Sequence, residues 1–239
     1  MMEIAEGVHR LGTKYVNFYV VEEGGLLTLI DTGIPAYWNQ ITSLLSSIDR
    51  SPSDVSAIVQ THYHSDHIGC TELLRAKSEA TVFIHELEAP GLRGEEKPGR
   101  LHGVGNVIFS PKTFQLMGHF MLRGGMKMPK VKEVETYADD DVLDVPGKPR
   151  VLFTPGHSKG HSSLLLEGRG ILFAGDALVT RTTSGKEGPS VMELNADPEQ
   201  AHRSLGRFDG VTAELLLPGH GEPWSEGVSE AVARAREVS

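Results

Sequence analysis

Cysteine is nearly absent from this sequence. Cys70 is its one cysteine among 239 residues, so no disulfide can form within the chain and no metal site can be built from several thiolates. A lone thiol also suits a reducing compartment. Because nothing beside it in the sequence would lower the pKa of its thiol, we expect Cys70 to be a buried packing residue and not a nucleophile. A metal site in this chain would have to use histidine and carboxylate ligands.

Long apolar runs are missing too. No stretch approaches the roughly 18 apolar residues that span a bilayer, and the opening letters MMEIAEGVHRLG lack the basic start and apolar core of an export signal. We therefore expect a cytoplasmic protein without a membrane partner. With 39% hydrophobic and 23% charged residues, the composition is that of an ordinary globular protein. We expect residues 1–239 to form a single domain.

An excess of positive charge is absent as well. The net charge is -9, whereas a protein that binds nucleic acid needs a basic face, so we expect no nucleic-acid partner. The stretch Arg93–Lys132 departs from this balance, because it has eight basic and two acidic residues. Such a run is usually a solvated surface, and the alternative is that it attracts an anionic substrate. The sequence carries no signal for an oligomeric state.

The chain does contain an alternation of strand and helix patterns. Short apolar runs predict strands at residues 15–21, 26–33, 55–60, 80–85, 150–155, 162–168, 170–176 and 213–220. Apolar residues at helical spacing predict helices at 38–48, 71–77 and 226–237, and a further helix from Asp197, with Pro198 at its first position. This order predicts an α/β protein with helices layered against mixed sheet.

Residues 90–140 interrupt the alternation. They are rich in glycine, proline and methionine, and we expect an irregular insertion that covers the active site. An apolar piece at residues 105–122 has a helical composition but is expected to be broken by Pro111 and Gly118. Four methionines would give the insertion an adaptable apolar wall, although such residues more often pack in a core: Met117, Met121, Met126 and Met128.

Three histidines and an aspartate crowd into the stretch THYHSDHIG, residues 61–69. They directly follow a predicted strand, on a loop of the kind that often carries function. These four side chains are His62, His64, Asp66 and His67. Burying adjacent imidazoles without partners is costly, so the cluster predicts metal binding. A catalytic zinc takes about three protein ligands, so two ions would need further donors.

Three later stretches supply those donors, and each follows a short apolar strand and a glycine. Their chemistry-bearing residues are His157, Asp176 and His220. Strand ends at one edge of a sheet bring distant residues together. One ion would be held by His62, His64 and His157. The other would be held by Asp66, His67 and His220, and Asp176 would bridge the two. We expect two divalent ions, zinc first, with iron or manganese as alternatives.

The motifs DTG at Asp31, HYHSDH, PGHSKGH, AGD and PGHG resemble, in order and approximate spacing, the five motifs of the metallo-β-lactamase-fold hydrolases. The resemblance spans residues 8 to 223. It implies a four-layer αβ/βα sandwich of two mixed β-sheets flanked by helices, with a binuclear metal site at one edge. It also implies that Asp31 lies behind the metal ligands and helps to fix them.

Two ions would ionise a bridging water near neutral pH, and the resulting hydroxide would attack a carbonyl. Asp176 would hold the ions, and Asp66 would accept a proton. An aspartate at the bridging position resembles the glyoxalase II and lactonase branches more than the β-lactamases. Glyoxalase II adds a helical domain, whereas 19 residues follow His220 here, and the lactonases use a tyrosine downstream of the bridge, whereas the last tyrosine here is Tyr137. We expect a small-molecule ester, thioester or lactone, anionic if the basic stretch lines the pocket.

Two other enzymes can be inferred from the same letters. A persulfide dioxygenase resembles this fold and would use one iron on His62, His157 and Asp176, which leaves the remaining ligands without a task. A serine hydrolase would use Ser158 in GHSKG with Asp176 and His220, but a strand is predicted after that turn where a helix is required.

The remaining histidines lack metal-ligand spacing. We expect surface or hydrogen-bonded positions for them, and a structural role for His161, which lies close to His157 in the sequence. The first group is His9, His85, His102, His119 and His202.

Overall fold

The computed structural model describes residues 2–97, 99–103, 107 and 110–238. Its described strands form two large sheets and a short ribbon. The first sheet has seven strands in chain order: β1 (Met2–Ala5), β2 (Val8–Thr13), β3 (Val16–Glu23), β4 (Leu26–Ile30), β5 (Val55–Val59), β6 (Thr81–His85) and β7 (Glu135–Tyr137). The second has the order β13 (Leu215–Pro218), β10 (Ile171–Gly175), β9 (Ser162–Leu166) and β8 (Arg150–Phe153). The ribbon pairs β11 (Val179–Arg181) with β12 (Glu187–Ser190).

Both sheets are mixed. In the first sheet, β1 to β4 pair antiparallel and β4 to β7 pair parallel. The strands predicted at residues 15–21 and 26–33 form the β3–β4 hairpin, whose turn residues Gly24 and Gly25 have φ of 60° and 82°, angles that glycine adopts without strain. In the second sheet, β10 pairs antiparallel with β9 and parallel with β13.

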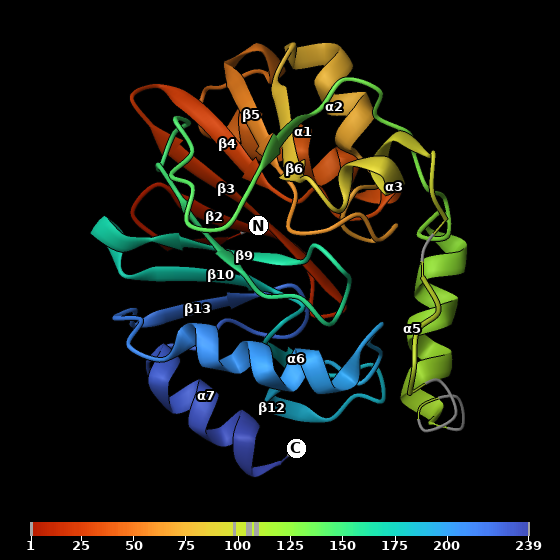
Figure 1. The fold of residues 1–239 in the computed structure, drawn as a ribbon. Coiled ribbons are helices and arrows are strands. Elements are labelled where there is room, and N and C mark those ends of the chain that lie inside the picture. The colour runs from red at the N-terminus through yellow and green to blue at the C-terminus, as the bar shows by residue number, and fades with distance from the viewer. Residues whose placement is uncertain (1, 98, 104–106, 108–109, 239) are drawn as a thin grey trace.

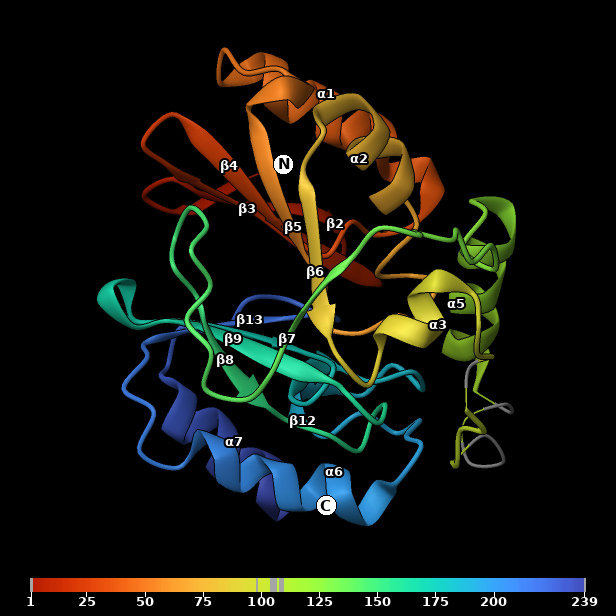
Figure 2. The same cartoon turned by 45° about the horizontal axis from the view of Figure 1, so that its top comes forward.

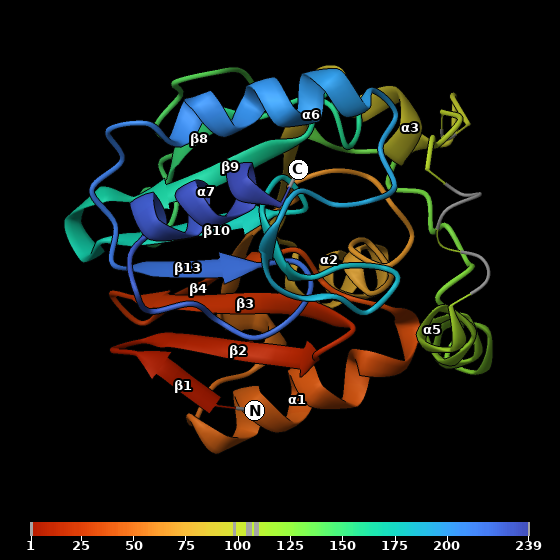
Figure 3. The same ribbon diagram turned by 90° about the horizontal axis from the view of Figure 1, so that it is seen from below.

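Helices cover the outer face of each sheet, which gives four layers (Figure 1 and Figure 3). The first sheet is covered by α1 (Trp38–Ser47) and α2 (Thr71–Ser78), and the second by α6 (Pro198–Ser204) and α7 (Val228–Glu237). The start of α6 is as predicted: the Asp197 side chain accepts a hydrogen bond from the backbone N–H of Gln200 at 2.9 Å, and Pro198 opens the helix. The last helix begins at Val228, two residues later than expected, after Gly227 with φ of 88°.

The strands bury both faces, and alternate side chains enter different cores. Along β3, Phe18 packs toward the helices of the first layer, while Tyr19 packs between the sheets. Along β10, Leu172 packs toward α6 and α7, while Phe173 packs between the sheets. This period of two is the geometry of a strand with a core on each side. The predicted αβ/βα sandwich is therefore the observed fold.

The two sheets are joined where their strands end. The Tyr19 hydroxyl donates to the carbonyl of Pro218 at 2.7 Å, and the backbone N–H of Ser162 donates to the carbonyl of Thr61 at 3.0 Å. The backbone N–H of Gly219 donates to the carbonyl of Gly175 at 2.8 Å. The first two bonds join the two sheets, and the third joins the ends of β13 and β10 within the second sheet, so the loops that follow β5, β10 and β13 lie at one edge.

The region of residues 90–140 is less irregular than expected, because it contains the helix α5 (Pro111–Leu122) and ends in the sheet strand β7. Ser110 is not helical and α5 begins at Pro111, but the helix continues through Gly118, so the break expected at Gly118 is wrong. Residues 105, 106, 108 and 109 of the expected apolar piece lie outside the described residues. Proline at the first helical position lacks an N–H that would be unpaired there anyway, and one interior glycine costs only about 1 kcal/mol. Figure 2 shows α5 and α3 (Ala89–Arg93) at the same end of the two sheets.

Of the described helices, none has the length and apolar character that crossing a bilayer demands.

Candidate metal centre

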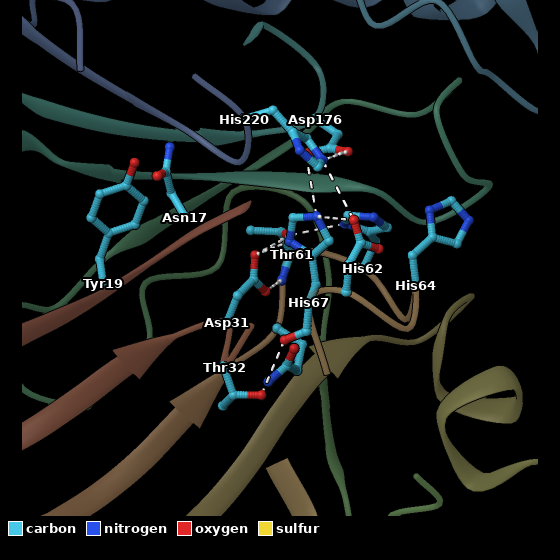
Figure 4. Close-up of polar contacts among 12 residues, drawn as sticks. Asn17, Tyr19, Asp31, Thr32, Thr61, His62, His64, His67, Asp176 and His220 are labelled. Atoms are coloured by element: carbon cyan, nitrogen blue, oxygen red, sulfur yellow. Dashed lines mark hydrogen bonds and ion pairs between the residues drawn. The ribbon is translucent and has the colours of Figure 1, made fainter. Parts of the chain in front are cut away.

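The side chains predicted to bind metal lie close together, and Figure 4 shows five of them between the two sheets: His62, His64, His67, Asp176 and His220. Their ligand atoms fall into three overlapping groups, within each of which all atoms lie within 4.8 Å of one another. The groups are His62, His64 and His157; His62, His67 and Asp176; and Asp66, His67 and His220. The first and third groups are the two ligand sets predicted from the sequence.

The first group comes from the loops after β5 and β8. Nδ1 of His157 donates to the carbonyl of Leu194 at 2.8 Å, so its Nε2 is the atom that faces the site. That Nε2 lies 2.9 Å from Nδ1 of His64. On the other side, Nδ1 of His62 lies 3.0 Å from the Thr61 hydroxyl. A hydrogen bond on the far nitrogen fixes the orientation of a ligating imidazole, and two of these three rings have one.

The third group, Asp66, His67 and His220, joins the loop after β5 to the loop after β13. Nδ1 of His67 lies 2.8 Å from Oδ2 of Asp31, and Nδ1 of His220 contacts the carbonyl oxygen of Tyr15. Both rings therefore present Nε2 to the site. The Oδ2 atom of Asp66 lies 3.8 Å from Nε2 of His67 and 3.6 Å from Nε2 of His220.

Asp176 lies between the two groups, where the sequence predicts a bridge. Its Oδ2 atom is 3.3 Å from Nε2 of His157 and 3.0 Å from Nε2 of His220. Its Oδ1 atom is 3.5 Å from Nε2 of His67. The carboxylate thus contacts ligands of both sets. Gly219 makes this approach possible, because a Cβ atom there would lie 2.1 Å from Oδ1 of Asp176.

Asp31 lies behind the predicted ligands and bonds to Thr61, which precedes His62, and to the ring of His67. Its carboxylate accepts hydrogen bonds from the backbone N–H and the hydroxyl of Thr61, each at 2.8 Å, and contacts His67 as described. The residue is buried and has a φ of 58°, a conformation that aspartate and asparagine adopt more readily than other side chains. One carboxylate therefore fixes the start of the loop and the ring of a ligand.

Three buried polar atoms support a fit between this cluster and metal ions. Nε2 of His62, Nε2 of His67 and Oδ1 of Asp176 have no hydrogen-bond partner among the described residues. Leaving such atoms unpaired costs about 1–3 kcal/mol each. Imidazole nitrogen and carboxylate oxygen are suitable donors for zinc, so ions at the centre of the cluster would satisfy all three atoms.

The protonation of the histidines differs between the two sets. Burial lowers the pKa of His64 and of His157 to about 4, and it lowers that of His62 well below its ordinary value. Burial opposes protonation of His67 and His220 too, but the carboxylates of Asp176 and Asp66 outweigh it and raise the pKa of both. The first set is therefore neutral and ready to bind metal near pH 7, whereas protons compete more strongly with metal for the second.

His161 supports Asp176 from behind. Its Nε2 accepts a hydrogen bond from the backbone N–H of Asp176 at 2.9 Å, so its Nδ1 is free to donate to the Thr154 hydroxyl, also at 2.9 Å. Burial lowers the pKa of His161 to about 3, which keeps the ring neutral. Both ring nitrogens are engaged by protein atoms, as a structural role requires.

Sequence reasoning missed Glu88, which ties the two histidine loops together. This buried carboxylate accepts hydrogen bonds from the backbone N–H of Tyr63 at 3.1 Å and of Gly160 at 2.6 Å. Tyr63 lies between two predicted ligands, and Gly160 belongs to the loop that carries His157. A glutamate just before the proline-containing helix α3 gave no local signal for this role.

A cavity of about 530 Å³ opens onto the predicted metal ligands His64, Asp66, His157, Asp176 and His220. Its wall is largely apolar and includes Leu116 and Phe120 of α5. Three of the four methionines expected in such a wall also line it, namely Met117, Met126 and Met128. Met121 does not line it and is 69% exposed. One of the eight basic residues in Arg93–Lys132, Lys112, lines the cavity.

The serine-hydrolase alternative does not fit the structure. The turn that contains Ser158 leads into the strand β9 and not into a helix. Both ring nitrogens of His220 are engaged, by Tyr15 and by Asp176, so neither is available to activate the serine. Cys70, for its part, is buried as expected, and burial raises the pKa of its thiol to about 12.

The other histidines lie outside the three ligand groups. His85 is buried and stacks on Phe153, with ring centroids 4.7 Å apart. His119 of α5 bonds through Nε2 to the Tyr37 hydroxyl at 2.7 Å. His9 is buried in β2, whereas His102 and His202 are exposed.

Known proteins resemble this chain over most of its length. The family model of the metallo-beta-lactamase superfamily matches residues 11–220. The probable metallo-hydrolase YflN of Bacillus subtilis is 27% identical to this chain, over 92% of this chain and 86% of its own length. The atrochrysone carboxyl ACP thioesterase of Aspergillus fumigatus is 27% identical, over 86% of this chain and 50% of its own length. A solved structure of a metallo-beta-lactamase family protein from Thermus thermophilus matches with a TM-score of 0.69 and 24% identity, over 97% of this chain and 79% of that one.

Proposed function

The chain belongs to the metallo-beta-lactamase superfamily, and we propose that it is a binuclear metal-dependent hydrolase that cleaves a small-molecule ester, thioester or lactone. The ions would be divalent, with zinc preferred over iron or manganese, because the donors are histidine nitrogens and carboxylate oxygens. The metallo-hydrolase and thioesterase names among its relatives support the reaction class.

Each set of ligands has a task in this proposal. One ion would be held by His62, His64 and His157, and the other by Asp66, His67 and His220, with Asp176 shared between them. When bound, the two ions would supply a water that ionises near neutral pH and a positive charge for the oxyanion that develops on the substrate.

The chain itself contributes orientation and proton transfer. His161 holds Asp176 from behind through the backbone N–H of Asp176, and Gly219, which has no side chain, leaves space for the carboxylate of Asp176. Asp66 lines the cavity, and 17% of its side chain is exposed, so its carboxylate can accept a proton from a group in the cavity. Asp31 and Glu88 fix the loops that carry the ligands.

The cavity favours substrates with an apolar group. It has a volume of about 530 Å³, and α5 and the methionines after it give it an apolar wall beside the ligands. Pockets of roughly 300–1,000 Å³ accommodate small organic molecules. An acyl thioester fits this description, and a thioesterase among the relatives supports it. Esters and lactones present the same kind of carbonyl and belong in the same screen.

The observation that carries the proposal is the grouping of three buried atoms that have no hydrogen-bond partner among the described residues and that could each bind metal: Nε2 of His62, Nε2 of His67 and Oδ1 of Asp176. The test is a screen of thioesters, esters and lactones with metal-loaded protein and with the variants Asp176→Ala and His64→Ala. Both variants should lose about 100-fold or more in kcat/KM while circular dichroism shows an intact fold. His202→Ala, which removes an exposed histidine on α6, is the matched control and should keep full activity. Unchanged turnover in either ligand variant would contradict the proposal.

A further inference from the structure

The cavity also contains a nearly buried arginine that the hydrolytic machinery does not use. The side chain of Arg181 in β11 is 8% exposed and lines the cavity. The preceding residue, Thr180, donates its backbone N–H to the carbonyl of His220 at 3.1 Å, so Arg181 follows directly on a contact with a predicted metal ligand. A charged side chain this buried needs acceptors for its donors.

Arg181 has more donors than its protein acceptors use. A guanidinium carries five N–H groups. Within the described part of the chain, its hydrogen bond goes from Nη1 to Oε1 of Glu187 at 2.6 Å. The edge formed by Nε and Nη2 is therefore without an acceptor there. This edge is the pair of parallel donors that binds a carboxylate through both of its oxygens.

Neighbouring groups hold the guanidinium in place and add positive charge. Its carbon lies 5.6 Å from the ring centroid of Tyr15, and Nζ of Lys14 lies 5.7 Å from the same centroid. Both residues line the cavity. The carbonyl of Tyr15 contacts Nδ1 of His220, which places this group of side chains beside the second set of metal ligands. Glu187 is 72% exposed, so the partner of Arg181 is largely in solvent.

We propose that Arg181, positioned on Tyr15 and assisted by Lys14, binds a carboxylate of the substrate while the apolar wall at α5 takes an apolar chain. The substrate of the proposed hydrolase is then an ester, thioester or lactone that carries an apolar chain and a free carboxylate. This inference rests on the proposed function for the identity of the cleaved bond. The anion site itself rests on Arg181 and not on the basic stretch Arg93–Lys132, which the sequence offered as an alternative source of attraction for an anion.

The kinetic test compares two esters of equal chain length on metal-loaded protein: 4-nitrophenyl octanoate and the mono-4-nitrophenyl ester of suberic acid, which ends in a free carboxylate. A two-pronged charge-assisted contact predicts that kcat/KM is about 10- to 100-fold higher for the suberate ester. In Arg181→Gln this preference should fall to about one through a higher KM for the suberate ester, with the octanoate ester unchanged. Arg181→Lys keeps the charge without the paired donors and should recover part of the preference.

The matched control is Glu187→Gln, which breaks the same ion pair but leaves the guanidinium in place. If Arg181 binds substrate, this variant keeps or increases the preference for the suberate ester. If Arg181 only holds the β11–β12 ribbon, the two glutamine variants lose activity alike on both esters, and the inference is wrong. An equal kcat/KM for both esters in the wild-type protein would also overturn it. A third ester that ends in phosphate tests the anion, and a preference for it would overturn the carboxylate assignment.

A binding measurement separates this inference from the proposed function. Calorimetric titration with octanoate and with 1-octanol, on metal-loaded and metal-free protein, needs no turnover. Octanoate should bind more tightly than the alcohol, and Arg181→Gln should weaken its binding about 10-fold or more. If no ester is cleaved but this difference is found, the hydrolase proposal fails and the anion site stands. If octanoate binds the wild-type protein and Arg181→Gln equally, the anion site fails whatever the esters show.

Discussion

Replacing Asp31 by asparagine tests how the ligand cluster is held. The buried carboxylate accepts hydrogen bonds from the Thr61 backbone N–H and hydroxyl and contacts Nδ1 of His67. Asparagine tolerates the positive φ of 58° at this position, so the backbone conformation is not in question. The amide oxygen can still accept the Thr61 N–H, but the amide NH₂ then faces Nδ1 of His67, and the acceptor that orients the ring is lost.

The expected magnitude follows from the donors that lose their acceptor. In Asp31→Asn one buried donor, the His67 N–H, is orphaned, which costs about 1–3 kcal/mol of the free energy of unfolding. In Asp31→Ala the Thr61 N–H is orphaned too, for about 2–6 kcal/mol, and the positive φ adds roughly 1–2 kcal/mol. The Thr61 hydroxyl can turn to Nδ1 of His62, 3.0 Å away, so it adds little.

Two assays separate stability from metal binding. Urea unfolding of metal-free protein measures the free energy of unfolding without the contribution of bound ligand. Competition with a chromophoric chelator measures the affinity for each ion, which should fall about 10- to 100-fold in Asp31→Asn at the ion held with His67. Asp197→Asn is the control, because asparagine also caps a helix and Asp197 lies at the start of α6. Wild-type stability and wild-type affinity for both ions in Asp31→Asn would refute the reasoning.

Three further predictions concern residues around the ligands. Gly219→Ala places a Cβ atom 2.1 Å from Oδ1 of Asp176, so metal analysis should show fewer ions per chain, and full loading would contradict the close approach. Glu88→Gln leaves one of two backbone donors unpaired and should cost about 1–3 kcal/mol in urea unfolding, whereas the exposed neighbour Glu86→Gln should cost nothing measurable. The pKa of Cys70, raised by burial to about 12, predicts that a thiol reagent at pH 8 reacts about 1,000-fold more slowly with the native protein than with the unfolded chain, and equal rates would count against that burial.

The sequence predicts the fold well where local signals are strong. The apolar runs at β5, β10 and β13 are short, bounded by turn residues and buried on both faces, so their letters alone indicate strands. The predicted ligands lie on the loops that follow such strands, which is why the two sets were predicted from motif positions. The short strands β7 and β11 gave no comparable signal, because three residues are too few to show a period.

Other features depend on tertiary contacts that local sequence does not encode. Glu88 bonds to residues 25 and 72 positions away, and no local pattern marks it. Arg181 ends the short strand β11 just before a polar turn, and only its burial beside the cavity distinguishes it from a surface arginine. The helix α5 was predicted to break because its proline and glycine were weighed by composition, whereas the position of Pro111 at the helix start removes its cost.

The most direct test of the central claim is elemental analysis of purified protein, before and after reconstitution with zinc, together with His220→Ala. The two ligand sets predict about two divalent ions per chain, and about one in the variant, because His220 belongs to one set alone. A single iron that the variant retains would instead support the mononuclear dioxygenase. No bound metal after reconstitution, with the fold intact, would contradict the account.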